Sequence, residues 1–224
     1  LIGLKSDTLD ILTKKTAEIA ANAGPATMLH QGIAKAYADG LERMESINGV
    51  KTCGLSSTPS DSSKNQAACH IFEADINTLF DQPALKEENF GPSSIILKAD
   101  TAEQLEQAAE GLEGQLTATI HGNEEDLKKH AKLIRILERK VGRLIFNGFP
   151  TGIEVCPSMH HGGPYPASTH SFFTSIGTAS ILRFVRPLCF QGFPDMALPI
   201  ELRNKNERGI LRLVDNTWTR EDID

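Results

Sequence analysis

Long apolar stretches are missing from this sequence, since charged or polar residues interrupt every hydrophobic run before it approaches the ~18 residues of a membrane-spanning helix. The composition is otherwise that of a folded globular protein, with 40% hydrophobic and 23% charged residues among 224. A chain of this length is at or just above the usual size of one domain. We therefore expect one large domain with an appendage, and no membrane partner.

An excess of basic residues is also missing. The chain carries 23 Lys and Arg against 29 Asp and Glu, which gives a formal net charge of -6. Nucleic-acid-binding surfaces are usually basic, and the lysines and arginines of residues 124–140 alternate with carboxylates, which is typical of a solvated helix face. The charge pattern favours small molecules or further copies of the chain as partners, and no nucleic acid.

Cysteine is scarce and widely spaced. Cys53, Cys69, Cys156 and Cys189 form no CxxC pair, which fits reduced thiols in a cytoplasmic protein better than a disulfide framework. Cys53 and Cys69 fall in or beside apolar strand-like stretches, where thiols are usually buried and inert. We expect these two to pack in the core rather than to act as nucleophiles. The sequence begins without methionine, so the lack of a signal peptide carries little weight.

Self-sufficient catalytic signatures are missing as well. The sequence contains no GxGxxG, Walker phosphate loop, GxSxG or HExxH, so it offers no nucleotide cradle, hydrolase elbow or zincin motif of its own. Its one cluster of metal-ligand types is Cys156 with His160, His161 and His170. The spacing matches no usual zinc pattern, and neighbouring histidines rarely reach one ion together. We expect no metal site, and interpret the segment as a polar loop lining a cleft.

The first third of the chain shows two helical and two strand-like patterns. Apolar residues recur at helical steps in two segments, and two others are short apolar runs bounded by turn formers. On the first helix we expect Leu9, Leu12, Ile19 and Ala20 to share a face. The predicted elements are a helix from Ser6 or Asp7 to Gly24-Pro25, a helix over 30–47, strands over 50–55 and 67–74, and a polar surface loop over 56–65.

Strands and helices then alternate. The predicted elements are a strand over 94–97, a helix that begins with a capping-box-like pair Asp100 and Glu103, a strand over 116–120, a long helix from Asn123 to Gly142, and a strand over 144–146. Two successive strand–helix–strand units predict an α/β fold with a mostly parallel sheet flanked by helices. A short helix near 176–184 follows a Pro/Gly/His segment. Ile210–Val214 predicts a strand with little local partner, and such a strand often pairs elsewhere.

The segment EENFGPSS, residues 87–94, precedes one of these strands. A carboxylate accepts two hydrogen bonds from a vicinal diol, which is how proteins commonly hold a nucleotide ribose. Phe90 offers a flat apolar surface for a heterocycle, and Gly91-Pro92 permits a close, rigid turn. On these residues alone, an alternative stays open in which Glu87 and Glu88 are solvated loop charges and Phe90 is a core residue.

A longer series of motifs gives this segment a context. EENFGPSSIIL resembles the E-E-x-F-G-P-strand segment of the aldehyde dehydrogenase superfamily, and it is followed by GLEGQLTATIHG, GRLIFNGFPTGIEV and HGGPYPAST. The last two motifs are similar to those of the branch that oxidises 2-oxoglutarate semialdehyde (2,5-dioxopentanoate) to 2-oxoglutarate. A neighbouring branch acts on long-chain fatty aldehydes, often with NADP. The resemblance covers residues 1–224.

The resemblance implies an oxidation that depends on NAD or NADP, in which a cysteine thiolate attacks a small-molecule aldehyde and a glutamate-activated water hydrolyses the thioester. Glu88 matches the family's glutamate that holds the nicotinamide ribose, and Phe90 matches the phenylalanine beside the nicotinamide. Five residues fall where family members line the aldehyde entrance: Phe146, Asn147, Gly148, Ile153 and Cys156.

One departure from the family is large. In relatives the nucleophilic cysteine lies in a G-Q-x-C-T-x-P-G-like motif, and LIGLKSDT resembles the segment directly after that motif. The resemblance therefore implies that the nucleophile, the glutamate base, the oxyanion-hole asparagine and the main cofactor domain precede Leu1, and that no catalytic residue lies in this chain. We expect the 224-residue chain alone to lack aldehyde oxidation.

The resemblance also implies a division of the chain, with a partial catalytic domain over 1–190 and a C-terminal extension over 191–224. In the family this extension adds a strand to a sheet of another subunit, so Ile210–Val214 is the expected oligomerisation strand of a homodimer or homotetramer. Two alternatives stay open: an NADP-dependent long-chain fatty aldehyde dehydrogenase, and a non-catalytic assembly or binding module. An acidic aldehyde needs a cation, yet no Arg or Lys lies between Ile145 and Phe173, and we expect His160 and His161 to be the candidates there.

Overall fold

The computed structural model describes residues 1–223 and divides the chain into two compact units, residues 1–180 and residues 181 onward. This division by compactness falls at residue 180, whereas the expected division at residue 190 concerns the roles of the two parts. The roles expected of the two parts, a catalytic portion and an assembly extension, stay predictions. No helix within residues 1–223 has the length and apolar character needed to cross a membrane.

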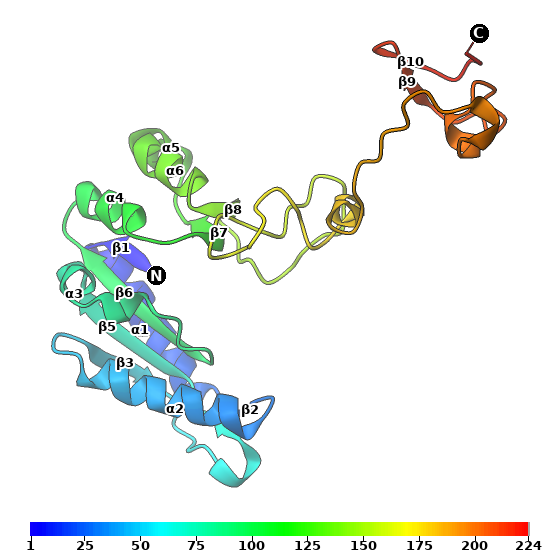
Figure 1. Cartoon of the computed structure of the whole chain (residues 1–224). Helices are drawn as coiled ribbons and strands as arrows, with labels where there is room; N and C mark the ends of the chain where they lie inside the picture. The colour runs from blue at the N-terminus through cyan, green and yellow to red at the C-terminus, as the bar shows by residue number, and fades with distance from the viewer. Residues whose placement is uncertain (224) are drawn as a thin grey trace. The chain divides into compact units, whose positions relative to one another are not determined.

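The first unit is built on a four-stranded sheet with the strand order β1-β6-β5-β3 (Figure 1). β6 runs parallel to both of its neighbours, and β3 at the edge is antiparallel to β5. A second pair, β7 and β8, is also parallel, whereas the short pair β2 and β4 is antiparallel. The strands are β1 (Ile2–Leu4), β2 (Ala26–Thr27), β3 (Lys51–Leu55), β4 (Gln66–Ala67), β5 (His70–Asp75), β6 (Ser93–Ala99), β7 (Gln115–Ile120) and β8 (Val141–Phe146). The predicted α/β class with a mostly parallel sheet is confirmed.

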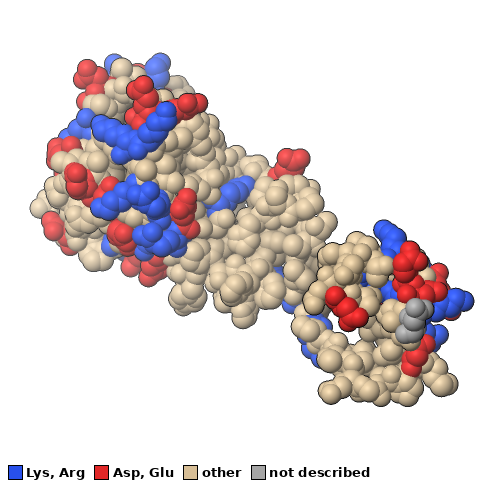
Figure 2. Space-filling view, turned by 90° about the horizontal axis from the view of Figure 1, so that it is seen from above, with Lys and Arg blue, Asp and Glu red and all other residues tan. Residues whose placement is uncertain are grey.

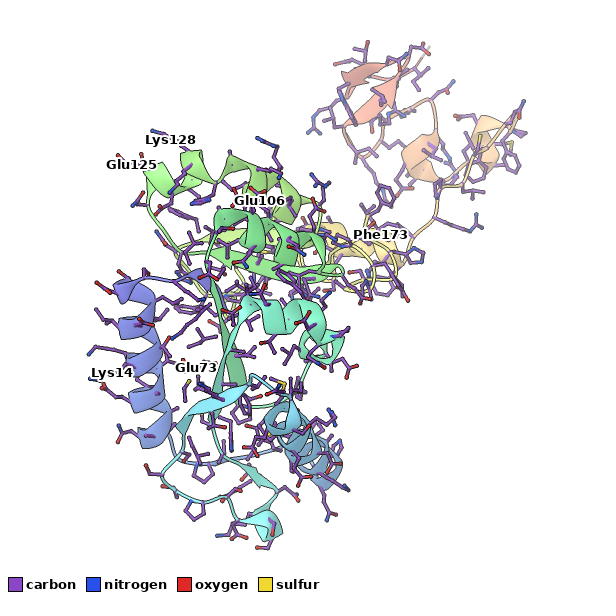
Figure 3. All side chains as sticks on the ribbon, turned by 90° about the vertical axis from the view of Figure 1, so that its left-hand side faces the viewer. Lys14, Glu73, Glu106, Glu125, Lys128 and Phe173 are labelled. Carbon is purple, nitrogen blue, oxygen red and sulfur yellow. The ribbon has the colours of Figure 1, made fainter. Side chains whose placement is uncertain are left out.

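Helices lie on both faces of the four-stranded sheet. Figure 3 shows α1 on one side of the sheet, with Lys14 pointing outward from it, and α2 and α3 on the other side. The α-helices are α1 (Asp7–Asn22), α2 (Gln31–Ser46), α3 (Ile76–Asp81), α4 (Ala102–Glu110), α5 (Glu124–Lys129) and α6 (Ala131–Glu138). The 3-10 helices are η1 (Ser62–Lys64), η2 (Pro83–Lys86), η3 (Thr178–Arg183), η4 (Asp195–Ala197) and η5 (Ile200–Leu202).

Strand β6 divides the apolar core between the two faces. Because successive side chains of a strand point to opposite faces, Ile96 packs with Leu9 of α1 in one cluster, and Leu97 packs with Ile76 and Leu79 of α3 in the other. A third cluster, which contains Ile136, joins α4 and α6 to β7 and β8. The sheet that carries the EENFGPSS segment is therefore fixed from both sides.

The N-terminal cap of α1 was predicted correctly, whereas that of α4 was predicted one residue too early. Ser6 caps α1 as predicted, since its hydroxyl accepts from the Leu9 amide at 3.2 Å. The capping box of α4 is formed by Thr101 and Gln104, so the prediction of Asp100 and Glu103 was one residue early. Thr101 is the residue with extended backbone angles, φ -134° and ψ 161°, which an N-cap position requires.

The inward face of α1 also differs from the prediction. Leu9 and Ala20 are buried, but Leu12 and Ile19 are 43% and 70% exposed. Thr13 takes the intervening inward position, and its hydroxyl donates to the Leu9 carbonyl at 2.8 Å. At about 100° per residue, Leu9, Thr13 and Ala20 lie on the same face of α1, which packs on the sheet. Leu12 and Ile19 lie outside this face.

The predicted long helix over 123–142 is two helices. Asn123 caps α5 as predicted, accepting from the Glu125 and Asp126 amides at 2.8 and 3.0 Å. His130 then adopts φ -105° and ψ 30°, outside helical values, and separates α5 from α6. The strand that follows begins at Val141 and therefore includes Gly142, which was predicted to be the helix stop.

Charges on α6 and at its C-cap pair with α4 rather than forming a basic surface. Lys132 contacts Glu106 at 2.5 Å and Arg139 contacts Glu110 at 3.4 Å. On the face shown in Figure 2, Lys and Arg are interspersed with Asp and Glu. Such exposed pairs contribute about 0–1 kcal/mol each, so they bear on surface character more than on stability.

The second unit contains the hairpin of β9 (Arg212–Val214) and β10 (Thr217–Thr219), which are antiparallel. The turn between them consists of Asp215 and Asn216, both with positive φ, 47° and 64°. A two-residue turn of this kind matches the twist of a hairpin. The expectation that Ile210–Val214 has little local partner was therefore wrong, because Thr217–Thr219 pairs with it. Its role in assembly stays a prediction.

Candidate functional site

The 87–92 loop, which joins η2 to β6, carries the two residues predicted to contact a cofactor. It begins where the Glu87 amide donates to the Ala84 carbonyl at 3.2 Å and ends where the Pro92 carbonyl accepts from the His70 amide at 3.0 Å. Between these points Gly91 has φ 155°, which favours glycine. The loop thus passes from a helical turn directly into the central strand β6.

This loop borders a hollow of about 570 Å³, which we call the loop hollow. Glu88 and Phe90 both line it, so the structure brings the two predicted residues together. Phe90 is 65% exposed, which excludes the alternative of a core residue. The other lining residues are Met28, Met44, Phe72, Leu85, Glu87, Asn89, Gly91, Pro92, Ser93, Ser94 and Ile95.

The chemistry of the loop hollow suits a polar group beside a flat apolar one. Glu88 is exposed, and none of the ion pairs among residues 1–223 involves it. An ionised carboxylate can accept two hydrogen bonds at once, and the exposed Phe90 ring offers a surface for stacking. These two groups therefore fit a ribose diol and an attached heterocycle.

Tyr37 of α2 packs against the 87–92 loop at Gly91. Its side chain is 2% exposed, and its hydroxyl donates to the Ala68 carbonyl at 2.7 Å. Burial of the phenol raises the pKa of Tyr37 to about 12. The side chain therefore stays neutral, and hydrogen-bonded, well above physiological pH.

The raised pKa of Tyr37 predicts a pH dependence. An unfolded tyrosine titrates near pH ~10, so the folded state retains the proton where the unfolded state has lost it. The stability contributed by Tyr37 is then fully present below pH ~10 and is lost as the pH rises through the folded pKa of about 12. Urea denaturation at a series of pH values should show the difference in free energy of unfolding between the native chain and Tyr37→Phe shrinking over this range. A constant difference would contradict the assignment.

The five residues predicted at the aldehyde entrance lie at and after the end of β8, and none of them lines the loop hollow. Phe146 ends the strand and is 43% exposed. Asn147 has φ 51°, and its side-chain amide accepts from the Gly122 amide at 3.0 Å and donates to the Gly122 carbonyl at 2.8 Å. Asn147 therefore ties β8 to the β7–α5 connection. Gly148, Ile153 and Cys156 are half-buried in the loop that follows.

Arg143 anchors the loop of the predicted aldehyde entrance, and the sequence analysis did not single it out. From β8 its guanidinium donates to the Pro150 carbonyl at 3.0 Å and to the Gly152 carbonyl at 3.3 Å. A cation in an otherwise apolar strand was the available signal, but it lies just before the interval from Ile145 to Phe173 in which a cation was sought. Because its donors serve backbone carbonyls, Arg143 fixes the loop that carries the predicted pocket residues.

The HGGP motif is a packing element rather than a free polar loop. Gly162 and Gly163 are buried, and a side chain on Gly142 would meet the Gly162 carbonyl oxygen at 1.8 Å. The His161 amide donates to the Thr174 hydroxyl at 2.8 Å. The motif therefore lies against the start of β8. No group of three or more His, Cys, Asp and Glu among residues 1–223 could hold a metal ion.

Cys53, Cys69 and Cys156 do not form an activated nucleophile. Cys53 and Cys69 pack beside the core cluster of Leu9 and Ile71, which confirms the expectation of core packing. Burial raises the pKa of both thiols, so both stay protonated at neutral pH and react poorly. Cys156 lies 3.3 Å from the Ser158 hydroxyl, which is no general base.

Comparison with protein-family models finds no match. Among curated proteins, the chain is 41% identical over 221 residues to an α-ketoglutaric semialdehyde dehydrogenase of Acinetobacter baylyi, covering 98% of this chain and 42% of that protein. It is 38% identical over 215 residues to α-ketoglutaric semialdehyde dehydrogenase 2 of Azospirillum brasilense, covering 96% and 41%. The chain thus spans about two-fifths of the length of these relatives.

Solved structures show the same fold at lower identity. The Δ-pyrroline-5-carboxylate dehydrogenase of Mycobacterium tuberculosis superposes with a TM-score of 0.62 at 15% identity, over 88% of this chain and 39% of that chain. The succinic semialdehyde dehydrogenase of Streptococcus pyogenes, in complex with NADP+, gives 0.53 at 22% identity, over 72% and 35%. The chain is therefore a relative of the α-ketoglutaric semialdehyde dehydrogenases along nearly its whole length, and its fold is that of part of an aldehyde dehydrogenase.

Proposed function

We propose that this chain is the C-terminal part of an NAD(P)-dependent aldehyde dehydrogenase that oxidises 2-oxoglutarate semialdehyde to 2-oxoglutarate. The observation that supports it most is the 41% identity to an α-ketoglutaric semialdehyde dehydrogenase over 98% of the chain. NAD or NADP would accept the hydride released when the aldehyde carbon is oxidised. Within this chain, Glu88 would hold the nicotinamide ribose and Phe90 would lie beside the nicotinamide ring.

The proposed chemistry needs a reactive cysteine, and the cysteines of this chain do not meet the requirement. Cys53 and Cys69 are half-buried with raised pKa values, and Cys156 has no basic partner within hydrogen-bond reach among the described residues. Cys189 is exposed in the second unit. We therefore assign the nucleophile to residues outside this chain. Five residues would border the aldehyde entrance: Phe146 at the end of β8, and Asn147, Gly148, Ile153 and Cys156 in the following loop, which Arg143 holds.

The first test compares substrates on the longer protein, expressed from the gene with the residues that precede Leu1. We expect NAD(P)H formation with 2-oxoglutarate semialdehyde, at a kcat/KM at least tenfold above that for a long-chain fatty aldehyde. The 224-residue chain alone should give none. A reversed substrate ranking favours a fatty aldehyde dehydrogenase, and turnover by the isolated chain would overturn the assignment of the nucleophile. No turnover with either aldehyde points to an assembly module.

The second test separates the two neighbouring glutamates of the loop. In the active protein, Glu88→Gln is expected to raise the KM for NAD(P)+ about tenfold or more, because a hydrogen bond to a charged group contributes roughly 1.5–3 kcal/mol. Glu87→Gln is the matched control, since Glu87 is adjacent, also exposed and also lines the loop hollow. We expect it to change the KM less than about twofold. Equal effects of the two substitutions would refute the role of Glu88.

A further inference from the structure

Asn89, between the two proposed cofactor contacts, occupies a recess in helix α2. A Cβ atom added to Gly40 would lie 1.9 Å from Asn89 Oδ1 and 2.5 Å from Asn89 Cγ. The amide of Asn89 thus fills the space that the missing side chain of Gly40 leaves, and its Nδ2 donates to Ser93 Oγ at 3.3 Å. Glycine in a helix interior costs about 1 kcal/mol relative to alanine, so this close approach gives Gly40 a packing reason.

Tyr37 makes a second contact from the same face of α2, one helical turn before Gly40. A Cβ atom added to Gly91 would lie 2.3 Å from Tyr37 Cδ2, so the backbone of the loop rests directly on the aromatic ring. The ring cannot yield, because its hydroxyl is held by the Ala68 carbonyl at 2.7 Å. The loop is therefore seated on α2 at Asn89 and again at Gly91, on either side of Phe90.

We propose that Gly40 and Tyr37 are positioning residues, which seat Asn89 and Gly91 so that Glu88 and Phe90 keep a fixed approach to the loop hollow. The inference rests on the proposed function of Glu88 and Phe90 as contacts of NAD or NADP. Neither Gly40 nor Tyr37 lines the loop hollow, so they act through the loop and not on the cofactor. A carboxylate that must accept both hydroxyls of a diol tolerates little displacement, since a shift of about 1 Å can cost about 100-fold in rate.

A double-mutant cycle tests the contact between Gly40 of α2 and Asn89 of the loop, which we call the seat. Gly40→Ala places a methyl group where the Asn89 amide lies. Hydrogen–deuterium exchange of the Glu87 and Ser93 amides, which donate to the Ala84 and Gly91 carbonyls, is therefore expected to accelerate about tenfold or more in the 224-residue chain. In an Asn89→Ala background the methyl group has room, so adding Gly40→Ala should accelerate exchange no further. Gly24→Ala is the matched control, because an added Cβ there meets nothing within 4 Å.

The same variants in the active longer protein give the functional readout. Gly40→Ala is expected to raise the KM for NAD(P)+ about tenfold while leaving the KM for the aldehyde within about twofold, and Asn89→Ala should relieve most of the added effect of Gly40→Ala. Equal effects of Gly40→Ala in both backgrounds, or unchanged loop exchange, would overturn the seat. If Gly40→Ala does not accumulate as folded protein, Asn89→Ala alone must accelerate exchange of the Glu87 and Ser93 amides, or the seat is overturned.

The cofactor role of Glu88 and the contact of Gly40 with Asn89 can fail independently of each other. If Glu88→Gln leaves the KM for NAD(P)+ unchanged while Gly40→Ala still accelerates loop exchange, the cofactor role fails and the seat stands. If Glu88→Gln raises that KM while loop exchange ignores Gly40→Ala, the cofactor role stands and the seat fails.

Discussion

Phe72→Ala is expected to lower the free energy of unfolding of the first unit by about 3–5 kcal/mol. Phe72 is 1% exposed on the central strand β5, and it also borders the loop hollow. Removing its ring leaves a cavity inside the sheet layer, because the surrounding backbone of β5 and β6 is fixed by pairing on both sides. The substitution therefore weakens the sheet and enlarges the loop hollow at once.

Urea denaturation followed by far-UV circular dichroism measures this loss. The single tryptophan, Trp218, lies in the second unit, so its fluorescence would report the wrong part of the chain. The matched control is Phe172→Ala, since that side chain is 94% exposed and its loss should change the free energy by about 0.5 kcal/mol or less. Similar losses for the two variants would contradict the central position of Phe72.

The regular part of the fold could be predicted from the sequence because it follows from local periodicity. The alternation of apolar strands and amphipathic helices after residue 93 indicated an α/β fold, and Ser6 and Asn123 marked helix starts by their capping chemistry. The break at His130 could not be predicted in this way, because the apolar spacing continues through it and the interruption lies in its backbone angles, φ -105° and ψ 30°. The hairpin turn at Asp215 and Asn216 was missed, although both residue types tolerate positive φ.

In the candidate site, too, features encoded by neighbouring residues could be proposed from the sequence, whereas contacts between distant residues could not. Glu88 and Phe90 could be proposed from the sequence because the carboxylate, aromatic and Gly-Pro turn are adjacent, and the structure places both at the loop hollow. Their role at the cofactor stays a prediction. Their support was not predictable, because Gly40 lies far from Asn89 in the chain and a glycine within a helix gives no hint of which side chain fills its recess. Arg143 was missed for a similar reason, since its partners are backbone carbonyls, which every residue has.

Gly142→Ala is expected to dislodge the HGGP motif from β8. The added Cβ would lie 1.8 Å from the Gly162 carbonyl oxygen and 3.0 Å from Gly163 Cα, both backbone atoms, so no change of rotamer can relieve the contact. Overpacking of this kind costs about 1–3 kcal/mol or more. We expect hydrogen–deuterium exchange of residues 160–177 to accelerate, while that of β5 and β6 stays unchanged.

Gly152→Ala is the control, since Gly152 lies in the loop after the same strand and an added Cβ there meets nothing within 4 Å. Exchange in 160–177 that is equally unaffected by both substitutions would show that the motif does not depend on this contact. The displaced segment contacts the proposed aldehyde entrance, because a Cβ on Gly177 would lie 2.9 Å from the Cys156 carbonyl oxygen. In the active protein, Gly142→Ala should therefore raise the KM for the aldehyde, whereas Glu88→Gln raises the KM for NAD(P)+. The opposite assignment of these two effects would mean that the loop hollow receives the aldehyde and the β8 loops border the cofactor.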